Sequence, residues 1–389
     1  MEHRMQVAHI ERLFDYLDTG TTAMADSVYY NDVATYTCDH QAQTERERLF
    51  RGRPIVQCLS CEIPNPGDYH TDDFSGVPIL VVRAADGSVN AFLNVCRHRG
   101  ARVVDGRGNR TRFSCPYHAW TYDQDGALIA IPNDDGFACV DRSQHALTRL
   151  PAVEKCGFVW VLPTPGTQEI DLSSSVGELH NELAQYGFDK YHHFETKVLE
   201  KRMNWKLVID TFLETYHLRM LHRNTIHPIL YSNLATFEAS GNSLRLVAAR
   251  RSLDAMRGQP KADWDLVKHS AIVYVLFPNT VLIVQGDHIN TFRVFPSGDS
   301  TDSAKMYVSL YTPQAADTDS ARRHWSKNMK LLLDTVEKED FEVGQKAQIG
   351  FYAGAQQHIT FGRNEPALAH YHASIREAVA PMSDGVRAR

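Results

Sequence analysis

The sequence has no long apolar run and little net charge, and each shortage excludes a class of partner. No hydrophobic stretch in the 389 residues approaches the roughly 18 that a membrane-spanning helix needs. The formal net charge is −6 and the isoelectric point is near 6.3, which is not typical of a general nucleic-acid or anionic-membrane binder. The first five residues, Met-Glu-His-Arg-Met, lack the basic region and apolar core of a secretory signal. We therefore expect a cytoplasmic protein that binds neither nucleic acid nor membrane.

Cysteine is scarce and its number is odd, which is not the pattern of a disulfide framework. The chain has seven cysteines, whereas paired bridges require an even number. Cys58 and Cys61 form one Cys-x-x-Cys pair, but no second such pair exists to complete a zinc site, so we expect both to be structural. No G-x-G-x-x-G motif follows a strand and opens a helix, so the sequence shows no flavin or nicotinamide site.

The turn signals divide the chain into four parts. Residues 1–45 begin with a helical pattern and form an N-terminal arm. Residues 46–162 contain short strands between Gly, Pro and Asp turns, which predicts a small all-β domain. Residues 163–175 are rich in Pro, Thr and Ser, as a linker is, and residues 176–389 form the second domain.

The second domain combines strand-like runs with one long helical pattern. That pattern occupies residues 320–350, where apolar residues recur at helical spacing. A sheet wrapped on such a helix is an α+β arrangement, so we expect a helix-grip-like antiparallel sheet around the long C-terminal helix. The strand-like runs are residues 244–249, 271–276, 280–285, 291–295 and 306–312.

The most informative stretch lies in the small β domain. Cys96 and His98 form a Cys-x-His pair, and sixteen residues later Cys115 and His118 form a Cys-x-x-His pair. A zinc site can use two Cys and two His, but zinc motifs usually pair Cys with Cys and His with His. The mixed pairing suits a [2Fe-2S] cluster of Rieske type, where two His replace two Cys on one iron. We favour the cluster over zinc and over chance residues in two unrelated loops.

Local structure predicts how the first pair can converge. Cys96 and His98 cannot share a helix face, because positions i and i+2 of a helix point apart. The strand-like residues 79–83 and 91–95 flank a turn at Asp86-Gly87 and predict a hairpin. Such a hairpin delivers Cys96 to a loop tip, where both side chains can face one cluster.

A second candidate metal site lies in the second domain. His217 and His222 are about 140° apart on an unbroken helix, so both can meet one ion only if the helix loosens after His217. Glu214, three residues earlier, would share a helix face with His217. Two His and one carboxylate form the facial triad of non-haem iron(II) oxygenases. Helical position alone does not choose the carboxylate. The acidic candidates on the long helix are Glu337, Glu339, Asp340 and Glu342.

These motifs resemble those of the Rieske non-haem iron oxygenases, in particular the terminal oxygenase (alpha-type) subunit of ring-hydroxylating or demethylating multicomponent systems. The resemblance rests on Cys96-Arg97-His98-Arg99-Gly100 and on Cys115-Pro116-Tyr117-His118-Ala119-Trp120. Ala119 departs from the pattern, because the family more often has Gly there. The resemblance continues through residues 361–366 and so covers nearly the whole chain.

The resemblance also implies which carboxylate completes the triad. Glu339-Asp340, followed by Gln348-Ile349-Gly350, is similar to the family's acidic pair ahead of Gln-x-Gly. This places the third iron ligand at Asp340, with Glu339 as the alternative. The implied cofactors are a Rieske [2Fe-2S] cluster in residues 46–162 and a mononuclear Fe(II) in residues 176–389.

Family members pass electrons from the cluster of one subunit to the iron of its neighbour in a ring-shaped homotrimer. The resemblance implies that Glu214 is the acidic bridge between His217 and His118 of the partner subunit. Asp210, about one turn upstream, is the alternative bridge. Many members have Asp at the bridge, and Glu resembles members that act on quaternary ammonium compounds without a second subunit type.

The implied function is a terminal oxygenase that uses O2 and electrons from a separate reductase, with or without a ferredoxin. It would hydroxylate a small organic substrate, aromatic or quaternary ammonium, by mono- or dioxygenation or by oxidative demethylation. The alternative is a Rieske electron-transfer protein whose second domain binds a partner without catalysis. The candidates for the pocket lining are Phe212, Leu218, Leu221 and Phe277.

Overall fold

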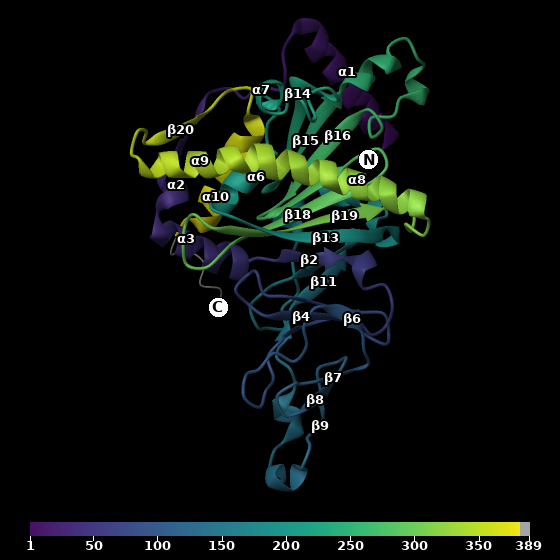
Figure 1. Cartoon of the computed structure of the whole chain (residues 1–389), viewed down its shortest axis with the longest axis vertical. Coiled ribbons are helices and arrows are strands. Elements are labelled where there is room, and N and C mark those ends of the chain that lie inside the picture. Colours follow the sequence, from purple (N-terminus) through teal and green to yellow (C-terminus); the bar gives the residue numbers. More distant parts are fainter. Residues whose placement is uncertain (382–389) are drawn as a thin grey trace.

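The protein has two parts arranged along its longest axis. The computed structural model describes residues 1–381. Figure 1 shows a large α+β part above and a narrow β part below, with strands β7, β8 and β9 at the lower end. The predicted α+β architecture, with a small β domain and a sheet-and-helix domain, is confirmed. None of the described helices is both long and apolar enough to cross a bilayer.

A seven-stranded antiparallel sheet forms the centre of the large part. Its strand order is β13-β19-β18-β17-β16-β15-β14. The five predicted strand-like runs all lie in this sheet, whereas the two edge strands were not predicted, because their side chains are largely half-buried or exposed and lack a clear apolar pattern. The strands are β13 (His192–Lys201), β14 (Leu230–Ser240), β15 (Ser243–Arg250), β16 (Ser270–Leu276), β17 (Thr280–Val284), β18 (Ile289–Pro296) and β19 (Ala304–Thr312).

Both faces of this sheet are buried, and alternate residues of a strand belong to separate cores. On β15, Leu246 and Ala248 lie in one core, and Val247 and Ala249 lie in the other. This follows because successive side chains of a strand point to opposite faces. The core that contains Ala248 also contains side chains of the long C-terminal helix, so that helix covers the same face.

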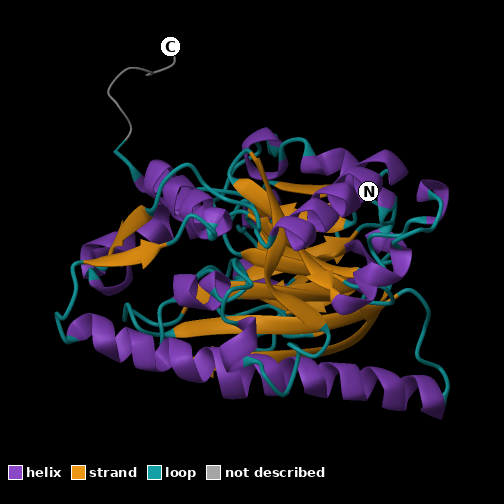
Figure 2. Ribbon diagram, turned by 90° about the horizontal axis from the view of Figure 1, so that it is seen from above, coloured by secondary structure: helices purple, strands orange, loops and turns teal. Residues whose placement is uncertain are grey.

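The long helix lies along one side of the sheet in the view from above (Figure 2). It consists of α8 (Asp319–Thr335), a π-helical turn η8 (Val336–Asp340) and α9 (Phe341–Tyr352). Thr318 caps its start, because the Thr318 hydroxyl accepts a 3.1 Å hydrogen bond from the backbone N–H of Ala321. The predicted helical pattern is confirmed, but the π turn inside it has no signature in the sequence.

Shorter helices surround the sheet and connect its strands. Those before the sheet are α1 (His3–Thr19), α2 (Ala34–Thr37), α3 (Asp39–Glu45), the π-helical η1 (Arg46–Arg51), α4 (Ser173–Val176) and α5 (Leu179–Gln185). Those after β13 are α6 (Trp205–Asp210), α7 (Leu218–Leu221) and α10 (Pro366–Val379). In the N-terminal arm, β1 (Tyr29–Asp32) pairs with β20 (His358–Phe361) of the large part.

The narrow part consists of three small antiparallel sheets. Their strand orders are β10-β5-β4-β3-β6, β11-β12-β2 and β7-β8-β9. The strands are β2 (Ile55–Leu59), β3 (Asp68–Asp72), β4 (Ile79–Arg83), β5 (Val89–Leu93), β6 (Arg107–Asn109), β7 (Arg112–Ser114), β8 (Thr121–Asp123), β9 (Leu128–Ala130), β10 (Arg149–Leu150), β11 (Ala152–Lys155) and β12 (Phe158–Val161).

The predicted hairpin that leads to Cys96 is present. β4 pairs with β5, with Ile79 opposite Leu93, and β5 ends two residues earlier than expected. The reason is Asn94, whose side-chain oxygen accepts hydrogen bonds from the backbone N–H groups of Val103 and Val104 at 3.1 and 3.2 Å. These bonds tie the end of the hairpin to the loop beyond Cys96.

Two buried polar contacts join the narrow part to the large sheet. Arg293 of β18 forms an ion pair with Asp72 of β3 at 2.8 Å. Tyr311 of β19 donates a 2.8 Å hydrogen bond to Glu62. Buried charges of this kind require their partners, so these contacts hold the two parts in one arrangement. The division into four parts proposed from the sequence stays a prediction.

Candidate active site and cluster site

The imidazoles of His217 and His222 face each other through their Nε2 atoms, which are 3.1 Å apart. The Nδ1 atom of His217 is hydrogen-bonded to the Glu214 carboxylate. The Nδ1 atom of His222 is hydrogen-bonded to Oε2 of Glu339 over 2.6 Å. Because a neutral imidazole carries one ring proton, both Nε2 atoms then present lone pairs to each other. Two facing lone pairs at this distance favour a cation between them.

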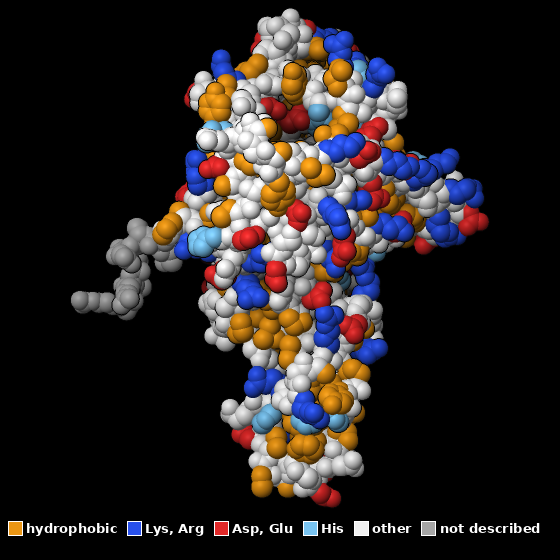
Figure 3. Space-filling view, turned by 60° about the vertical axis from the view of Figure 1, so that its left-hand side comes forward, with side chains coloured by type: hydrophobic (Ala, Val, Ile, Leu, Met, Phe, Trp, Pro, Cys, Tyr) orange, Lys and Arg blue, Asp and Glu red, His pale blue; other side chains and the backbone are white. Residues whose placement is uncertain are grey.

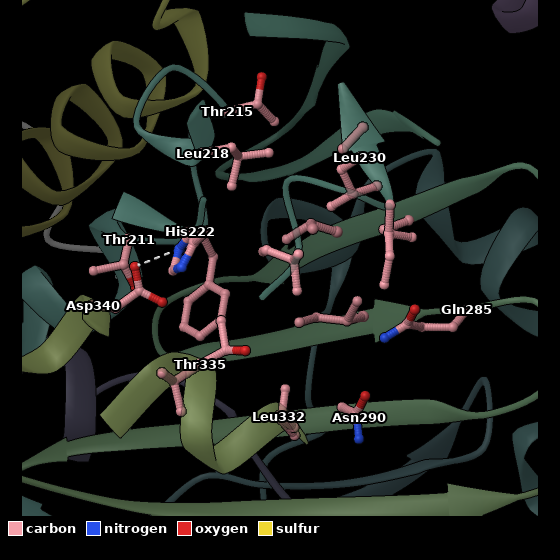
Figure 4. A pocket seen from close by; sticks show the side chains of 18 of the residues that line it. Thr211, Thr215, Leu218, His222, Leu230, Gln285, Asn290, Leu332, Thr335 and Asp340 are labelled. Atoms are coloured by element: carbon pink, nitrogen blue, oxygen red, sulfur yellow. Dashed lines mark ion pairs between the residues drawn. The ribbon is translucent and has the colours of Figure 1, made fainter. Parts of the chain in front are cut away.

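Asp340 adds a carboxylate oxygen at the same point (Figure 4). Its Oδ1 lies 3.0 Å from Nε2 of His222 and 3.5 Å from Nε2 of His217. Asp340 is 6% exposed, and among residues 1–381 its Oδ1 has no hydrogen-bond donor. Burial raises the pKa of this carboxyl group. An orphaned carboxylate oxygen beside two imidazole lone pairs fits a mononuclear iron with open coordination positions.

The neighbouring carboxylates of the long helix have other partners. Oε2 of Glu339 accepts a 2.6 Å hydrogen bond from the Thr225 hydroxyl in addition to its bond with His222. Glu339 therefore contacts the outer nitrogen of His222, whereas Asp340 faces the inner one. Glu337 and Glu342 form ion pairs with lysines at 2.6 and 2.8 Å. The π turn η8 ends at Asp340, and such turns are frequent at functional sites.

The segment that carries the histidines is not the helix expected from the sequence. α6 ends at Asp210, and α7 is a single turn with His217 at its N-cap and His222 at its C-cap. The prediction that Glu214 and His217 share a helix face is therefore wrong. The expected helix that loosens after His217 is also wrong, because residues 218–221 between the histidines are helical and the irregular backbone lies before His217. The contact arises because the Glu214 carboxylate also accepts hydrogen bonds from the backbone N–H groups of Tyr216 and His217.

Asp210 lies in a different, buried network. Its Oδ2 accepts a 2.7 Å hydrogen bond from the Tyr36 hydroxyl, and its Oδ1 lies 2.8 Å from Nε2 of His372. Burial and the Asp210 charge both raise the pKa of Tyr36. Asp210 thus ties α6 to the N-terminal arm and to α10, and its two oxygens point to these partners and not to His217.

A cavity of about 290 Å3 opens beside the triad. Two of its predicted lining residues, Phe212 and Leu218, are present there. Leu221 and Phe277 are not among the described lining residues, and Phe277 is instead fully buried in the core of the sheet. The sequence did not indicate the polar residues of the lining, because they come from loops, strands and the helix α8, which are far apart in the chain. They include Thr211, Thr215, Arg250, Gln285, Asp287, His288, Asn290, Asn328 and Thr335.

The predicted cluster ligands come together on two similar loops at the narrow end. The thiols of Cys96 and Cys115 are each 3% exposed. The backbone N–H of Gly100 donates to the Cys96 carbonyl at 3.0 Å, and that of Ala119 donates to the Cys115 carbonyl at 2.9 Å. Gly100 and Ala119, each four residues after the loop cysteine, both adopt positive φ angles, of 80° and 55°. The two loops thus have the same backbone turn.

The two histidines of these loops lie side by side, with ring centroids 4.7 Å apart. Trp120 stacks on His98 at 4.9 Å. Nδ1 of His98 is buried and has no hydrogen-bond partner among the described residues. Burial raises the pKa of Cys115, and the adjacent Cys96 raises it further. Buried thiols and an unpaired imidazole nitrogen at one point fit a [2Fe-2S] cluster, which takes deprotonated thiolates and neutral imidazoles.

Comparison with known proteins matches a family model to each of the two parts of the chain. Residues 53–144 match the family model of the Rieske [2Fe-2S] domain, and residues 188–381 match that of the ring hydroxylating alpha subunit (catalytic domain). The glycine betaine monooxygenase oxygenase subunit of Chromohalobacter salexigens is 33% identical over 380 residues, which covers 86% of this chain and 81% of the relative.

Two solved structures show the same fold. A quaternary ammonium Rieske monooxygenase, described for carnitine oxidation and inter-subunit electron transfer, has a TM-score of 0.77 at 21% identity and covers 91% of this chain and 95% of its own. Naphthalene 1,2-dioxygenase from Rhodococcus sp., with indole bound, has a TM-score of 0.71 at 17% identity and covers 97% and 99%. Together with the family matches and the relative at 33% identity, this shows that the chain belongs to the Rieske non-haem iron oxygenases, as an oxygenase subunit with a [2Fe-2S] Rieske domain and a mononuclear iron catalytic domain.

Proposed function

We propose that this chain is a terminal oxygenase in which the two sites above hold its two iron centres. The observation that supports this proposal is the convergence of three ligand atoms, Nε2 of His217, Nε2 of His222 and Oδ1 of Asp340. The Nδ1 atom of each imidazole is in addition hydrogen-bonded to a carboxylate. The proposed cluster ligands are Cys96, His98, Cys115 and His118. With the irons bound, the triad supplies O2 activation and the cluster supplies single electrons.

The carboxylates behind the histidines have a positioning role. Glu214 and Glu339 each accept a hydrogen bond at Nδ1 of one histidine, which fixes the tautomer and leaves Nε2 free. Such carboxylates also raise the basicity of the imidazole ligand. Their loss would therefore weaken iron binding without removing a ligand.

We propose that the working unit is a ring of identical subunits. Figure 1 shows β7 and β8, which flank the loop of Cys115, at the lower end of the molecule, and α7, which lies between the two histidines, at the upper end. His118 is exposed at its loop tip, so the histidine can face a second copy. Figure 3 shows hydrophobic side chains exposed at the lower end and around a hollow in the upper part. Tyr117, Tyr216 and Met220, which are 54%, 63% and 82% exposed, lie next to the ligands of the two sites.

Glu214 is the proposed bridge in this assembly. Its carboxylate already holds His217, and the partner that would complete the bridge is His118 of the partner subunit. The electrons are proposed to come from a separate reductase, because the chain has no dinucleotide-binding motif.

The proposed reaction is hydroxylation of a small organic molecule. The relatives are named for glycine betaine and carnitine, and the solved relatives include an enzyme of the aromatic naphthalene. Hydroxylation of a carbon next to nitrogen gives demethylation, whereas reaction at a ring gives a hydroxylated ring.

Iron content tests the proposal directly. Two irons in the cluster and one at the triad predict about three irons per chain, whereas an electron carrier without a catalytic centre would hold about two. We expect His217→Ala and His222→Ala each to reduce the count to about two. The matched control is His227→Ala, because His227 lies five residues after His222 and its imidazole contacts Arg251 instead of the triad side chains.

The proposal fails if the two triad variants retain about three irons per chain and consume O2 at the rate of the wild type. Loss of the visible cluster absorbance in either variant would mean that the narrow part needs an intact large part to fold. The number of irons per chain would then be compared with the cluster content of the same sample.

A further inference from the structure

We infer that the active-site cavity recognises its substrate through a carboxylate group, which is bound by Arg250, Gln285 and Asn290, while an apolar body extends toward the iron ligands. The inference rests on the proposed function, because it assigns a substrate class to the same cavity. It is carried by the side chains that line the sheet side of the cavity.

Strands β15 and β18, and the residue that follows β17, carry polar side chains at one end of the face that lines the cavity. On β15, Ala248 and Arg250 are alternate residues, so both side chains point to the same face. Gln285 follows Ile283 by two positions at the end of β17, and Asn290 of β18 pairs directly with Ile283. All five residues line the cavity. Figure 4 shows Gln285 and Asn290 on the side of the cavity opposite His222 and Asp340.

This polar end has N–H donors without a hydrogen-bond acceptor among the described residues. Arg250 donates from Nε to the Ser270 carbonyl at 3.1 Å and from Nη2 to Oε1 of Gln285 at 2.5 Å, and these bonds leave both hydrogens of Nη1. The bond to Arg250 also fixes the Gln285 amide, whose NH2 group is turned away from the guanidinium. Asn290 is 1% exposed, and neither atom of its amide has a hydrogen-bond partner among residues 1–381.

A buried amide without a partner is costly, so Asn290 indicates a missing ligand at this end of the cavity. Arg250 is the one Lys or Arg among the described lining residues. It forms no ion pair within the described chain, although burial lowers the pKa of Arg250 and the charge of the nearby Asp287 partly opposes this lowering. A guanidinium flanked by amide donors matches the two oxygens of a carboxylate.

The cavity lacks the features that bind an organic cation. Quaternary ammonium groups are recognised by the faces of several aromatic rings. Phe212 is the one Phe, Tyr or Trp among the described lining residues. The acidic groups of the lining are also engaged: Glu214 holds His217, Asp340 faces the proposed iron, and Asp287 bonds Nδ1 of His288 at 2.7 Å.

The middle of the cavity is apolar and leaves room for a substrate body. Ala248 and Ala271 lie directly opposite each other on β15 and β16, so two methyl groups form the floor at this point. Leu230, Ile283 and Leu332 add aliphatic surface around it. A carboxylate held at the polar end would therefore place an uncharged body over the two alanines, with its far end near the iron ligands.

Calorimetry on the anaerobic, iron-loaded holoenzyme tests the inference, because it measures binding without turnover. The probes are two matched acid and amide pairs, 4-propylbenzoate with 4-propylbenzamide and octanoate with octanamide, together with choline. We expect each acid to bind about tenfold to a hundredfold more tightly than its amide, since a charged hydrogen bond is lost in the amide. Choline should bind more weakly than the acids.

Two variants examine the polar end. Arg250→Gln should remove most of the preference for acid over amide, while Arg251→Gln, the matched control at the exposed neighbouring arginine, should leave it unchanged. Asn290→Leu should raise the melting temperature of the free protein, because an unpaired buried amide is replaced by a side chain of similar size, and should weaken acid binding. A purely structural Asn290 would instead give a less stable protein with normal binding.

The inference is overturned if the wild type binds acids and amides equally, if choline binds more tightly than every acid, or if both Arg250→Gln and Asn290→Leu keep the acid preference. Absence of binding by both acids counts against it as well. Failure of the proposed function is a separate result, since a chain with only about two irons would show it in the iron count of the same sample.

Discussion

At the residue scale, the Tyr122 hydroxyl is placed to donate a hydrogen bond to Cys96, a proposed cluster ligand. It accepts a 2.9 Å hydrogen bond from the backbone N–H of Arg97, and its own hydrogen is therefore left for Sγ of Cys96, 3.4 Å away. Burial raises the pKa of Tyr122, so the hydroxyl stays protonated. Hydrogen bonds to the sulfur ligands stabilise the more negative, reduced state and raise the reduction potential.

We expect Tyr122→Phe to lower the reduction potential of the cluster by the order of 50 mV, which is about 1 kcal/mol for one electron. A redox titration followed by electron paramagnetic resonance measures this shift. Tyr69→Phe is the control, because Tyr69 is buried in the same core and contacts Phe113 instead of a ligand. Equal shifts in both variants, or no shift in Tyr122→Phe, would contradict the assigned hydrogen bond.

The departure at Ala119 also has a residue-scale explanation. The family more often has glycine at this position, and the structure shows why glycine suits it: Ala119 has a φ of 55°, in the left-handed region that side chains disfavour by about 1 kcal/mol. The equivalent Gly100 has a φ of 80° and no atom within 4 Å of an added Cβ. The cost at Ala119 is therefore conformational and not steric, which is why the loop tolerates alanine.

At the scale of the elements, the sequence predicted the structural features that depend on a local residue pattern. The proposed cluster ligands and the five inner strands have local signatures, since residue spacing and runs of apolar residues are found within one segment. The π turn at Val336–Asp340 and the short α7 have none, because their shape depends on contacts with distant residues such as Thr225 with Glu339. The cavity residues Arg250, Gln285 and Asn290 come from three strands that only the sheet brings together.

The long helix carries both the proposed ligand Asp340 and Glu339, whose carboxylate is hydrogen-bonded to the proposed ligand His222. This arrangement predicts that replacing Glu339 and replacing Glu342 change the iron affinity differently. Glu339→Ala removes the acceptor at Nδ1 of His222, so we expect iron affinity at the triad to fall about tenfold to a hundredfold. Competition with a chelator, followed by metal analysis, measures the affinity. Glu342→Ala is the matched control, because Glu342 is exposed on α9 and pairs with Lys346. An equal loss of iron in both variants would indicate general destabilisation of the helix, and the cluster absorbance serves as an internal standard.

At the scale of the whole molecule, the cluster site lies toward the lower end and the triad lies in the upper part (Figure 1). In the proposed ring, the cluster of one subunit passes electrons to the triad of the next subunit. The activity of each triad therefore depends on the cluster of a neighbouring subunit. This predicts complementation between two inactive variants. Cys96→Ser removes a proposed cluster ligand and leaves the triad, whereas His217→Ala removes a triad ligand and leaves the cluster site. Each variant alone should be inactive in substrate-dependent O2 consumption.

Coexpression of the two variants in equal amounts should restore activity. In a ring with one direction of transfer, half of the subunits keep the triad, and half of these have a neighbour that keeps the cluster site, so about a quarter of the wild-type activity is expected. Mixing the two separately assembled variants should give no activity, because their subunits are not exchanged. If electrons instead passed within one chain, no coexpressed ring would contain a complete path. An inactive coexpressed sample in which metal analysis shows both remaining sites loaded would therefore contradict transfer between subunits, and with it the proposed role of Glu214 at the subunit boundary.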